Sequence, residues 1–156
     1  MMVNLTSIIV AAGAAVSQSV SALGHARVAN KCNFSVHAWS VGTNVSGPVK
    51  IDAGHVFGER FVSDRTSGGR AIKITKTADG LYQGDPQTIL AYSLNGDTVF
   101  YDLSDVFGDA FAGSKLEVTG NASGCRPIVW QDGTPPAGSQ VKSCTSEADV
   151  ILTLCA

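Results

Sequence analysis

The side chains of this sequence best suited to chemistry are carboxylates near the middle of the chain. Asp102, Asp105 and Asp109 fall where an alternating run, Val99–Ser104, gives way to glycine and aspartate. Aspartates at such a junction either cap turns through the nearby backbone or form an acidic patch that binds cations or sugar hydroxyls. We therefore treat these three residues as candidate ligand-binding residues.

Glu59 is the other carboxylate of interest, because it stands between two phenylalanines at alternate positions. A glutamate in that register is either half-buried with a raised pKa or paired with a cation such as Arg60 or Arg65. Two carboxylates that face one sugar across about 5–10 Å perform glycoside hydrolysis, one as acid and one as base or nucleophile. Glu59 and Asp102 are accordingly the candidate catalytic residues.

Aromatic side chains are a second candidate class, since their flat apolar faces stack on sugar rings. Most aromatics of a small β domain belong to its core, so we expect at least half of them to be buried. The candidates are Trp39, Tyr82, Tyr92, Tyr101 and Trp130.

We expect no metal and no cofactor. His25 would become the amino terminus if a signal peptide were cleaved after Gly24, and an amino-terminal histidine chelates copper through its amine and ring. His37 and His55 lack the spacing that would identify them as further ligands. A serine-nucleophile elbow, a phosphate loop and a dinucleotide fingerprint are all missing from the sequence.

These residues must be positioned by strands, because short alternating runs recur between turn residues. The runs are Phe34–Trp39, Phe57–Phe61, Ile72–Thr75, Thr88–Leu94, Thr98–Leu103, Lys115–Thr119, Ile128–Trp130 and Val150–Leu154. Loops rich in Gly, Pro or Ser are expected at 42–48, 63–69, 78–86, 95–97, 120–124 and 132–139, and a helical turn only near Ser104–Phe107 or Ser146–Asp149. The pattern predicts an all-β sandwich or flattened barrel.

Asn95-Gly96 is the strongest local signal, because it separates two alternating runs. A type I′ hairpin turn needs positive φ at both central positions, which Asn and Gly tolerate. We expect this turn to join 88–94 to 98–103.

The 156 residues indicate one domain behind a secretory signal. The apolar run Ile8–Val16 is too short to span a bilayer and is followed by small and polar residues. Cleavage is expected after Ala22, Gly24 or Ala26, which divides the chain into a signal peptide, 1–24, and a single domain, 25–156. The remaining chain has no second long apolar run, so we expect a released protein without a membrane span.

The charge of the chain argues against one class of partner. The net charge is −2 and the sequence has no basic cluster of the kind that binds nucleic acid. Seventeen glycines and 15% charged residues suit a compact, turn-rich β protein. We expect a monomer.

Four cysteines follow the signal, and an even number in a secreted chain indicates a disulfide framework. Their spacing allows three pairings. Three glycosylation sequons are also present, at Asn33, Asn44 and Asn121. Asn44 and Asn121 lie in loop-like sequence and are the better candidates for carrying a glycan.

Several ordered motifs resemble thaumatin-like proteins. Arg27–Trp39 resembles the first strands of that family, and Pro86–Gly96 followed by Phe100–Ser104 is similar to its central hairpin. The order of Gly108–Phe111, Trp130–Pro136 and the terminal Leu154–Ala156 is similar to the small fungal branch, the antigenic thaumatin-like or Bys family. The resemblance implies a small thaumatin-like β-sandwich and a disulfide from first to last segment, Cys32–Cys155, which leaves Cys125–Cys144.

The sequence matches only some of the residues that form the catalytic cleft of the family. Larger thaumatin-like proteins bind β-1,3-glucan, and some hydrolyse it with an acidic cleft that contains an Arg, a Glu and several Asp. Asp102 matches an aspartate of that cleft, whereas Tyr92 stands where its glutamate is expected, and Phe107 where a loop acid often sits. No arginine aligns clearly with that of the cleft.

The leading hypothesis is therefore a secreted, non-catalytic protein that binds a glycan or a cell surface, with an antigen or effector-like role. Its expected partner is β-glucan or another cell-wall or host-surface glycan, and its location is extracellular or cell-wall associated. One alternative is an endo-β-1,3-glucanase that uses Glu59 and Asp102. Another is a structural protein of the cell wall.

Overall fold

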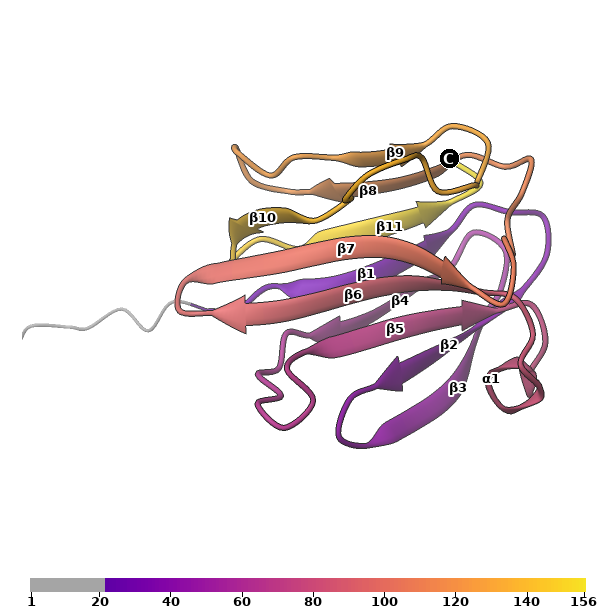
Figure 1. Cartoon of the computed structure of the whole chain (residues 1–156), viewed down its shortest axis with the longest axis horizontal. Helices are drawn as coiled ribbons and strands as arrows, with labels where there is room; N and C mark the ends of the chain where they lie inside the picture. The colour runs from indigo at the N-terminus through magenta and orange to yellow at the C-terminus, as the bar shows by residue number, and fades with distance from the viewer. Residues whose placement is uncertain (1–21) are drawn as a thin grey trace, which may run out of the picture.

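The computed structural model describes residues 22–156 and has two β-sheets packed face to face (Figure 1). The five-stranded sheet contains, in spatial order, β4 (Val56–Arg60), β1 (His25–Asn30), β11 (Val150–Leu154), β8 (Leu116–Gly120) and β9 (Ile128–Trp130). The six-stranded sheet contains β10 (Lys142–Thr145), β7 (Thr98–Val106), β6 (Gln87–Asn95), β5 (Arg70–Thr75), β2 (Val36–Val41) and β3 (Val45–Ile51). The predicted all-β sandwich is confirmed.

The core lies between the sheets and follows the alternation of the sequence. On β7, the side chains of Val99, Tyr101 and Leu103 are buried in the core, whereas those of Phe100 and Asp102 project from the opposite face of the strand. Each neighbouring strand pair within a sheet is antiparallel except β1 and β11, which pair in parallel. That pairing brings the first and last described strands together in the middle of one sheet.

Two disulfides close the sandwich, and both pairings implied by the resemblance are confirmed. Cys32 bonds to Cys155 across 123 residues, and Cys125 bonds to Cys144 across 19 residues. In the chain-entropy model these cross-links stabilise the fold by about 5 and about 3 kcal/mol, because the longer loop restricts the unfolded chain more.

Three local predictions were wrong. β3 occupies part of the expected loop 42–48; six of its seven residues are exposed, so it lacks an alternating signature. The helical turn, α1 (Gly80–Gln83), lies in the expected loop 78–86. Residues 104–106 extend β7 where a turn was expected, whereas the turn expected near 146–149 is present before β11.

The β6–β7 hairpin is confirmed, but its turn differs from the prediction. Asn95 pairs with Thr98, so the two central residues are Gly96 and Asp97 rather than Asn95 and Gly96. Gly96 has φ +57°, and Asp97 is outside the positive-φ region. A glycine at the first central position is the signature of a type II′ turn, which also suits the right-handed twist of a hairpin.

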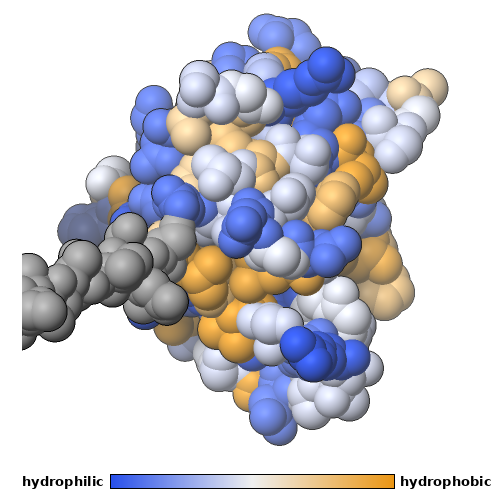
Figure 2. Space-filling view, turned by 90° about the vertical axis from the view of Figure 1, so that its left-hand side faces the viewer, coloured by the Kyte–Doolittle hydropathy of each residue, from blue (hydrophilic) through white to orange (hydrophobic). Residues whose placement is uncertain are grey.

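No helix among residues 22–156 is long and apolar enough to cross a membrane. Figure 2 looks onto the end of the molecule that carries the β6–β7 turn, and there the apolar surface lies in separate patches among polar residues.

Candidate functional site

Glu59 and Tyr92 meet between the two sheets, beside the edge strand β4. Glu59 lies opposite the buried Ala26 of β1, and its Oε1 accepts a hydrogen bond of 3.0 Å from the Tyr92 hydroxyl. The same hydroxyl accepts a hydrogen bond of 3.3 Å from the Val62 N–H. Burial, and then the charge of Glu59, raise the pKa of Tyr92, so the phenol remains a neutral donor.

Arg70 supplies the positive charge of this cluster. Its Nε lies 3.7 Å from Glu59 Oε1, and a terminal nitrogen donates a hydrogen bond of 2.8 Å to Ser40 Oγ. The sequence offered Arg60 or Arg65 as the partner of Glu59; the structure pairs it with Arg70, which strand pairing brings near. The cluster ties β4 of one sheet to β5 and β6 of the other.

Asp102 lies on the other side of the six-stranded sheet. It is opposite Ala91 of β6. Its neighbours Tyr101 and Leu103 point into the core, so the Asp102 side chain projects outward from the sheet. Its Oδ1 is buried and has no hydrogen-bond partner among residues 22–156. The structure therefore does not bring Glu59 and Asp102 together, because the six-stranded sheet separates their side chains.

Asp105 and Asp109 form a carboxyl pair where β7 ends. Asp105 Oδ1 accepts a hydrogen bond of 2.6 Å from Thr88 Oγ1 on the neighbouring strand. Burial, and then the adjacent Asp109 carboxylate, raise the pKa of Asp105 to about 6. Strand alternation directs the side chains of Asp102 and Asp105 to opposite faces of β7, although both residues line one hollow of about 290 Å³. Asp109 does not line that hollow, so the three candidate aspartates do not form one patch.

Of the aromatic candidates, four lie in the interior. Trp39, Tyr92, Tyr101 and Trp130 are at most 3% exposed, which confirms that more than half are buried. Tyr82 is 72% exposed and packs edge-to-face on Trp39, with ring centroids 5.3 Å apart.

A shallow groove runs over the outer face of the six-stranded sheet, beside β7 and the loop that leads into β10. It consists of three adjoining hollows, of about 370, 140 and 290 Å³. The first two share Phe100 and Val141, and the last two share Asp102. We call this surface the outer groove and define it by Ser93, Phe100, Asp102, Ser104, Gln140 and Val141.

Phe100 is the residue of the outer groove that the sequence analysis missed. Its ring is 39% exposed and lies on the same face of β7 as Asp102, two positions away. The alternation of β7 contained this information, because residues at even spacing share a face of a strand.

His25 is held by structure rather than free for a ligand. Its Nδ1 lies 3.0 Å from Asp149 Oδ1, and its backbone N–H donates to the same oxygen at 2.8 Å. Arg27 Nε donates to the other Asp149 oxygen at 2.6 Å. Across residues 22–156, no three His, Cys, Asp or Glu side chains are grouped so that they could hold a metal ion.

All three sequon asparagines are exposed: Asn33, Asn44 and Asn121. Asn121 has an additional structural role, since its Oδ1 accepts a hydrogen bond of 2.8 Å from the Asp149 N–H. Its amide nitrogen remains the atom that would carry a glycan.

Two packed β-sheets, antiparallel except for the β1–β11 pair, and a first-to-last disulfide define a small thaumatin-like protein, and comparison with known proteins agrees. Residues 13–156 match the family model Bys1, described as Blastomyces yeast-phase-specific protein. The chain belongs to this family.

Relatives with related names match most of the chain. It is 27% identical over 144 residues to an antigenic thaumatin-like protein of Arthroderma benhamiae, covering 86% of this chain and 72% of the relative. It is also 27% identical over 146 residues to the secreted thaumatin-like protein calA of Emericella nidulans, covering 84% and 81%. These names and the two disulfides fit an extracellular protein.

Two solved structures share the fold. The protein elicitor MoHrip2 from Magnaporthe oryzae superposes with a TM-score of 0.69 at 24% identity, covering 85% of this chain and 99% of that one. The thaumatin-like xylanase inhibitor TLXI gives a TM-score of 0.53 at 11% identity, covering 84% and 99%.

Proposed function

We propose that this protein is a secreted, non-catalytic binding protein that holds a glycan in the outer groove. The observation that carries the proposal is that an exposed ring, Phe100, and a carboxylate, Asp102, lie two positions apart on one face of β7 and line the same hollow. Sugar sites combine such an apolar face with a few directed polar groups. Asp102 accepts hydrogen bonds from sugar hydroxyls while a pyranose face lies on Phe100.

The surroundings of Glu59 support a role without hydrolysis. Its carboxylate is engaged by Tyr92 and Arg70, and the six-stranded sheet separates it from Asp102. A glycosidase needs two carboxyl groups on opposite sides of one glycosidic bond. The relative named as antigenic and the structural neighbour named as a protein elicitor support an antigen or effector-like role.

Glycan-array profiling and retention on insoluble β-1,3-glucan test this proposal. Phe100→Ala and Asp102→Asn are each expected to weaken retention about three- to tenfold, the range of one stacked ring or one directed hydrogen bond. Phe107→Ala is the matched control, because Phe107 is 66% exposed and does not line the outer groove. An array without signal would favour a structural cell-wall role, and release of reducing sugar would overturn the non-catalytic assignment.

A further inference from the structure

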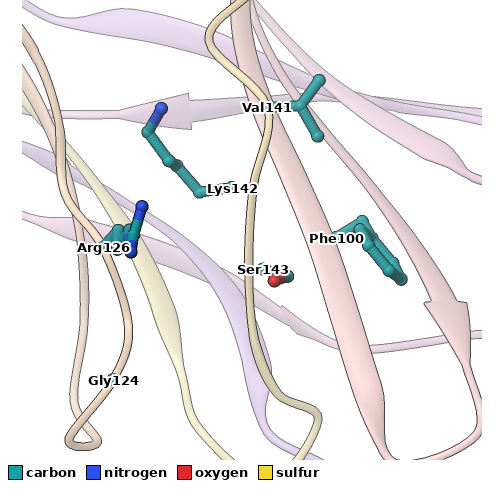
Figure 3. A pocket seen from close by; sticks show the side chains of 6 residues that line it. All are labelled: Phe100, Gly124, Arg126, Val141, Lys142 and Ser143. Atoms are coloured by element: carbon teal, nitrogen blue, oxygen red, sulfur yellow. The ribbon is translucent and has the colours of Figure 1, made fainter.

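One end of the outer groove is basic. The hollow of about 370 Å³ lies between β10 and the loop that follows β8, and it is lined by Phe100, Gly124, Arg126, Val141, Lys142 and Ser143. Figure 3 shows Arg126 and Lys142 on one side of β10, and Phe100 and Val141 on the other. We call this end the basic hollow.

The two cations of the basic hollow have no anionic partner within the described chain. Ion pairs elsewhere in residues 22–156 engage Arg27, Lys50, Arg70 and Lys115, but neither Arg126 nor Lys142. The lining contains no carboxylate. Two like charges without a counter-charge attract an anion, and they do so here in a chain whose net charge is −2.

The segments that carry both cations are also held in position by the fold. Cys125, next to Arg126, is bonded to Cys144 of β10, two residues from Lys142. The carbonyl of Arg126 accepts a hydrogen bond of 2.5 Å from the buried Tyr101 hydroxyl of β7. A disulfide and a partly buried hydrogen bond thus fix the backbone segments that carry the two basic residues before any ligand arrives, which lowers the entropic cost of binding.

We propose that the basic hollow binds the acidic group of an anionic saccharide, a carboxylate or a sulfate ester. Arg126 offers a planar, two-pronged donor and Lys142 a point charge, and both suit such oxyanions. Ser143 and the Phe100 ring line the same hollow from the other side of β10, the edge strand (Figure 3), and offer the hydroxyl and apolar contacts that a neighbouring sugar ring uses. A saccharide fits better than a peptide because the hollow continues, through Phe100 and Val141, into the polar outer groove at Asp102.

This inference deepens the proposed function and rests on it, because it assigns an orientation and a ligand class to the same groove. The acidic residue of the saccharide lies at Arg126 and Lys142. The neutral hydroxyls of the next sugar donate to Asp102, which lies where the other two hollows of the outer groove join.

Titration calorimetry with three oligosaccharides of equal length tests the inference: a neutral glucan, a carboxylated uronate and a sulfated glucan. At least one of the two acidic oligosaccharides is expected to bind at least about tenfold more tightly than the neutral one. This preference is expected to fall as the salt concentration rises. Equal affinity of the uronate and the sulfated glucan assigns the hollow to both groups, and unequal affinity assigns it to the tighter one. Neutral and acidic oligosaccharides that bind equally would overturn the inference and leave the proposed function standing.

Variants separate the basic hollow from general charge. Arg126→Gln with Lys142→Gln is expected to abolish the acidic preference and leave neutral binding within about twofold. Lys31→Gln with Arg65→Gln removes the same charge from exposed positions outside the hollow and is expected to keep the preference. Arg126→Lys with Lys142→Arg keeps both charges and should retain most of it, which guards against a folding defect in the first pair.

Three results would reject the basic hollow as a saccharide site. The first is an equal loss of preference in the control pair, which would mean attraction by overall charge. The second is an unchanged preference after both glutamine substitutions. The third is a polyglutamate peptide that binds as tightly as the acidic oligosaccharide, which would make the hollow a peptide site. Failure of all three oligosaccharides to bind would reject this inference and the proposed function together.

Discussion

Glu59 is a catalytic candidate in the sequence and a structural residue in the fold. In sequence it is a carboxylate between two phenylalanines; in the structure a tyrosine and an arginine contact it. Its side chain is 20% exposed, which is enough burial to make an unpaired charge unfavourable. The cluster therefore holds the two sheets together on the β4 side of the sandwich.

Tyr92→Phe tests this structural role. The substitution removes the hydroxyl that donates to Glu59 and accepts from the Val62 N–H. We expect the free energy of unfolding to fall by about 1–2 kcal/mol, because two partly buried polar groups lose a partner. Urea unfolding measures it, with Tyr82→Phe as control, since Tyr82 is 72% exposed. A loss that is equal in both variants would contradict the role assigned to the cluster.

Asp105 predicts a pH dependence of stability. Its pKa is about 6 in the folded state, above the usual value of about 3.9 in an unfolded chain. Its contribution is therefore most favourable below about pH 4 and is lost as the pH rises to about 6, beyond which it is constant. Asp105→Asn keeps the oxygen that accepts from Thr88 and is expected to stabilise the fold by about 1–2 kcal/mol at pH 7.

Urea unfolding between pH 4 and pH 8 measures this effect. Asp109→Asn should flatten the pH dependence less than Asp105→Asn does, because burial is the larger cause of the raised pKa and the Asp109 charge a smaller one. Parallel pH profiles for the wild type and Asp105→Asn would show that the pKa of Asp105 is the same in the folded and unfolded states, and would contradict the prediction.

At the scale of elements, strands with one buried face were predictable and the others were not. β11 alternates in burial along its whole length and β7 does so from Thr98 to Ser104, so period two revealed both strands. β3 is an exposed edge strand, and β10 has four residues of which one is buried, so neither has a hydrophobic pattern to detect. Their places follow from pairing with β2 and β7, which are partners distant in sequence.

The same distinction applies to the candidate site. Phe100 and Asp102 were accessible to sequence reasoning, because strand alternation puts both on one face. The Glu59–Arg70 pair was not, since it depends on how two sheets pack at one edge. Arg126 and Lys142 do not stand out in the sequence either, because they lie in different segments without a charge cluster; the Cys125–Cys144 pairing was the one available sign that these segments meet.

The start of β1 predicts where the secreted chain begins. Gly24 donates to the Ser146 carbonyl at 2.8 Å and accepts from the Phe61 N–H at 2.9 Å, and Leu23 packs against the core. A Cβ at residue 24 would lie 2.2 Å from the Ala148 oxygen, so this close approach also requires glycine. We therefore propose cleavage after Ala22 rather than after Gly24 or Ala26.

Amino-terminal sequencing of the secreted protein is expected to begin at Leu23. A chain that begins at His25 should unfold with about 1–3 kcal/mol less free energy than one that begins at Leu23, because it lacks two backbone hydrogen bonds and an apolar contact. A secreted protein whose first residue is His25 would refute the assignment and would return that histidine to consideration as an amino-terminal metal ligand.

At the scale of the whole molecule, the two disulfides have separate tasks. Cys32–Cys155 joins the segments that follow β1 and β11, the parallel pair in the centre of the five-stranded sheet. Cys125–Cys144 instead links the loop after β8 in one sheet to the edge strand β10 of the other. The first therefore governs global stability, and the second governs the geometry of the basic hollow.

Replacing each pair by serine separates these tasks. Loss of Cys32–Cys155 is expected to lower the free energy of unfolding by about 5 kcal/mol, and loss of Cys125–Cys144 by about 3 kcal/mol, as their loop lengths require. At a temperature where both variants remain folded by circular dichroism, only the Cys125–Cys144 variant should lose preference for an acidic oligosaccharide. If the Cys32–Cys155 variant lost it equally, the preference would depend on global rigidity, and the local cross-link would have no special part in holding Arg126 beside Lys142.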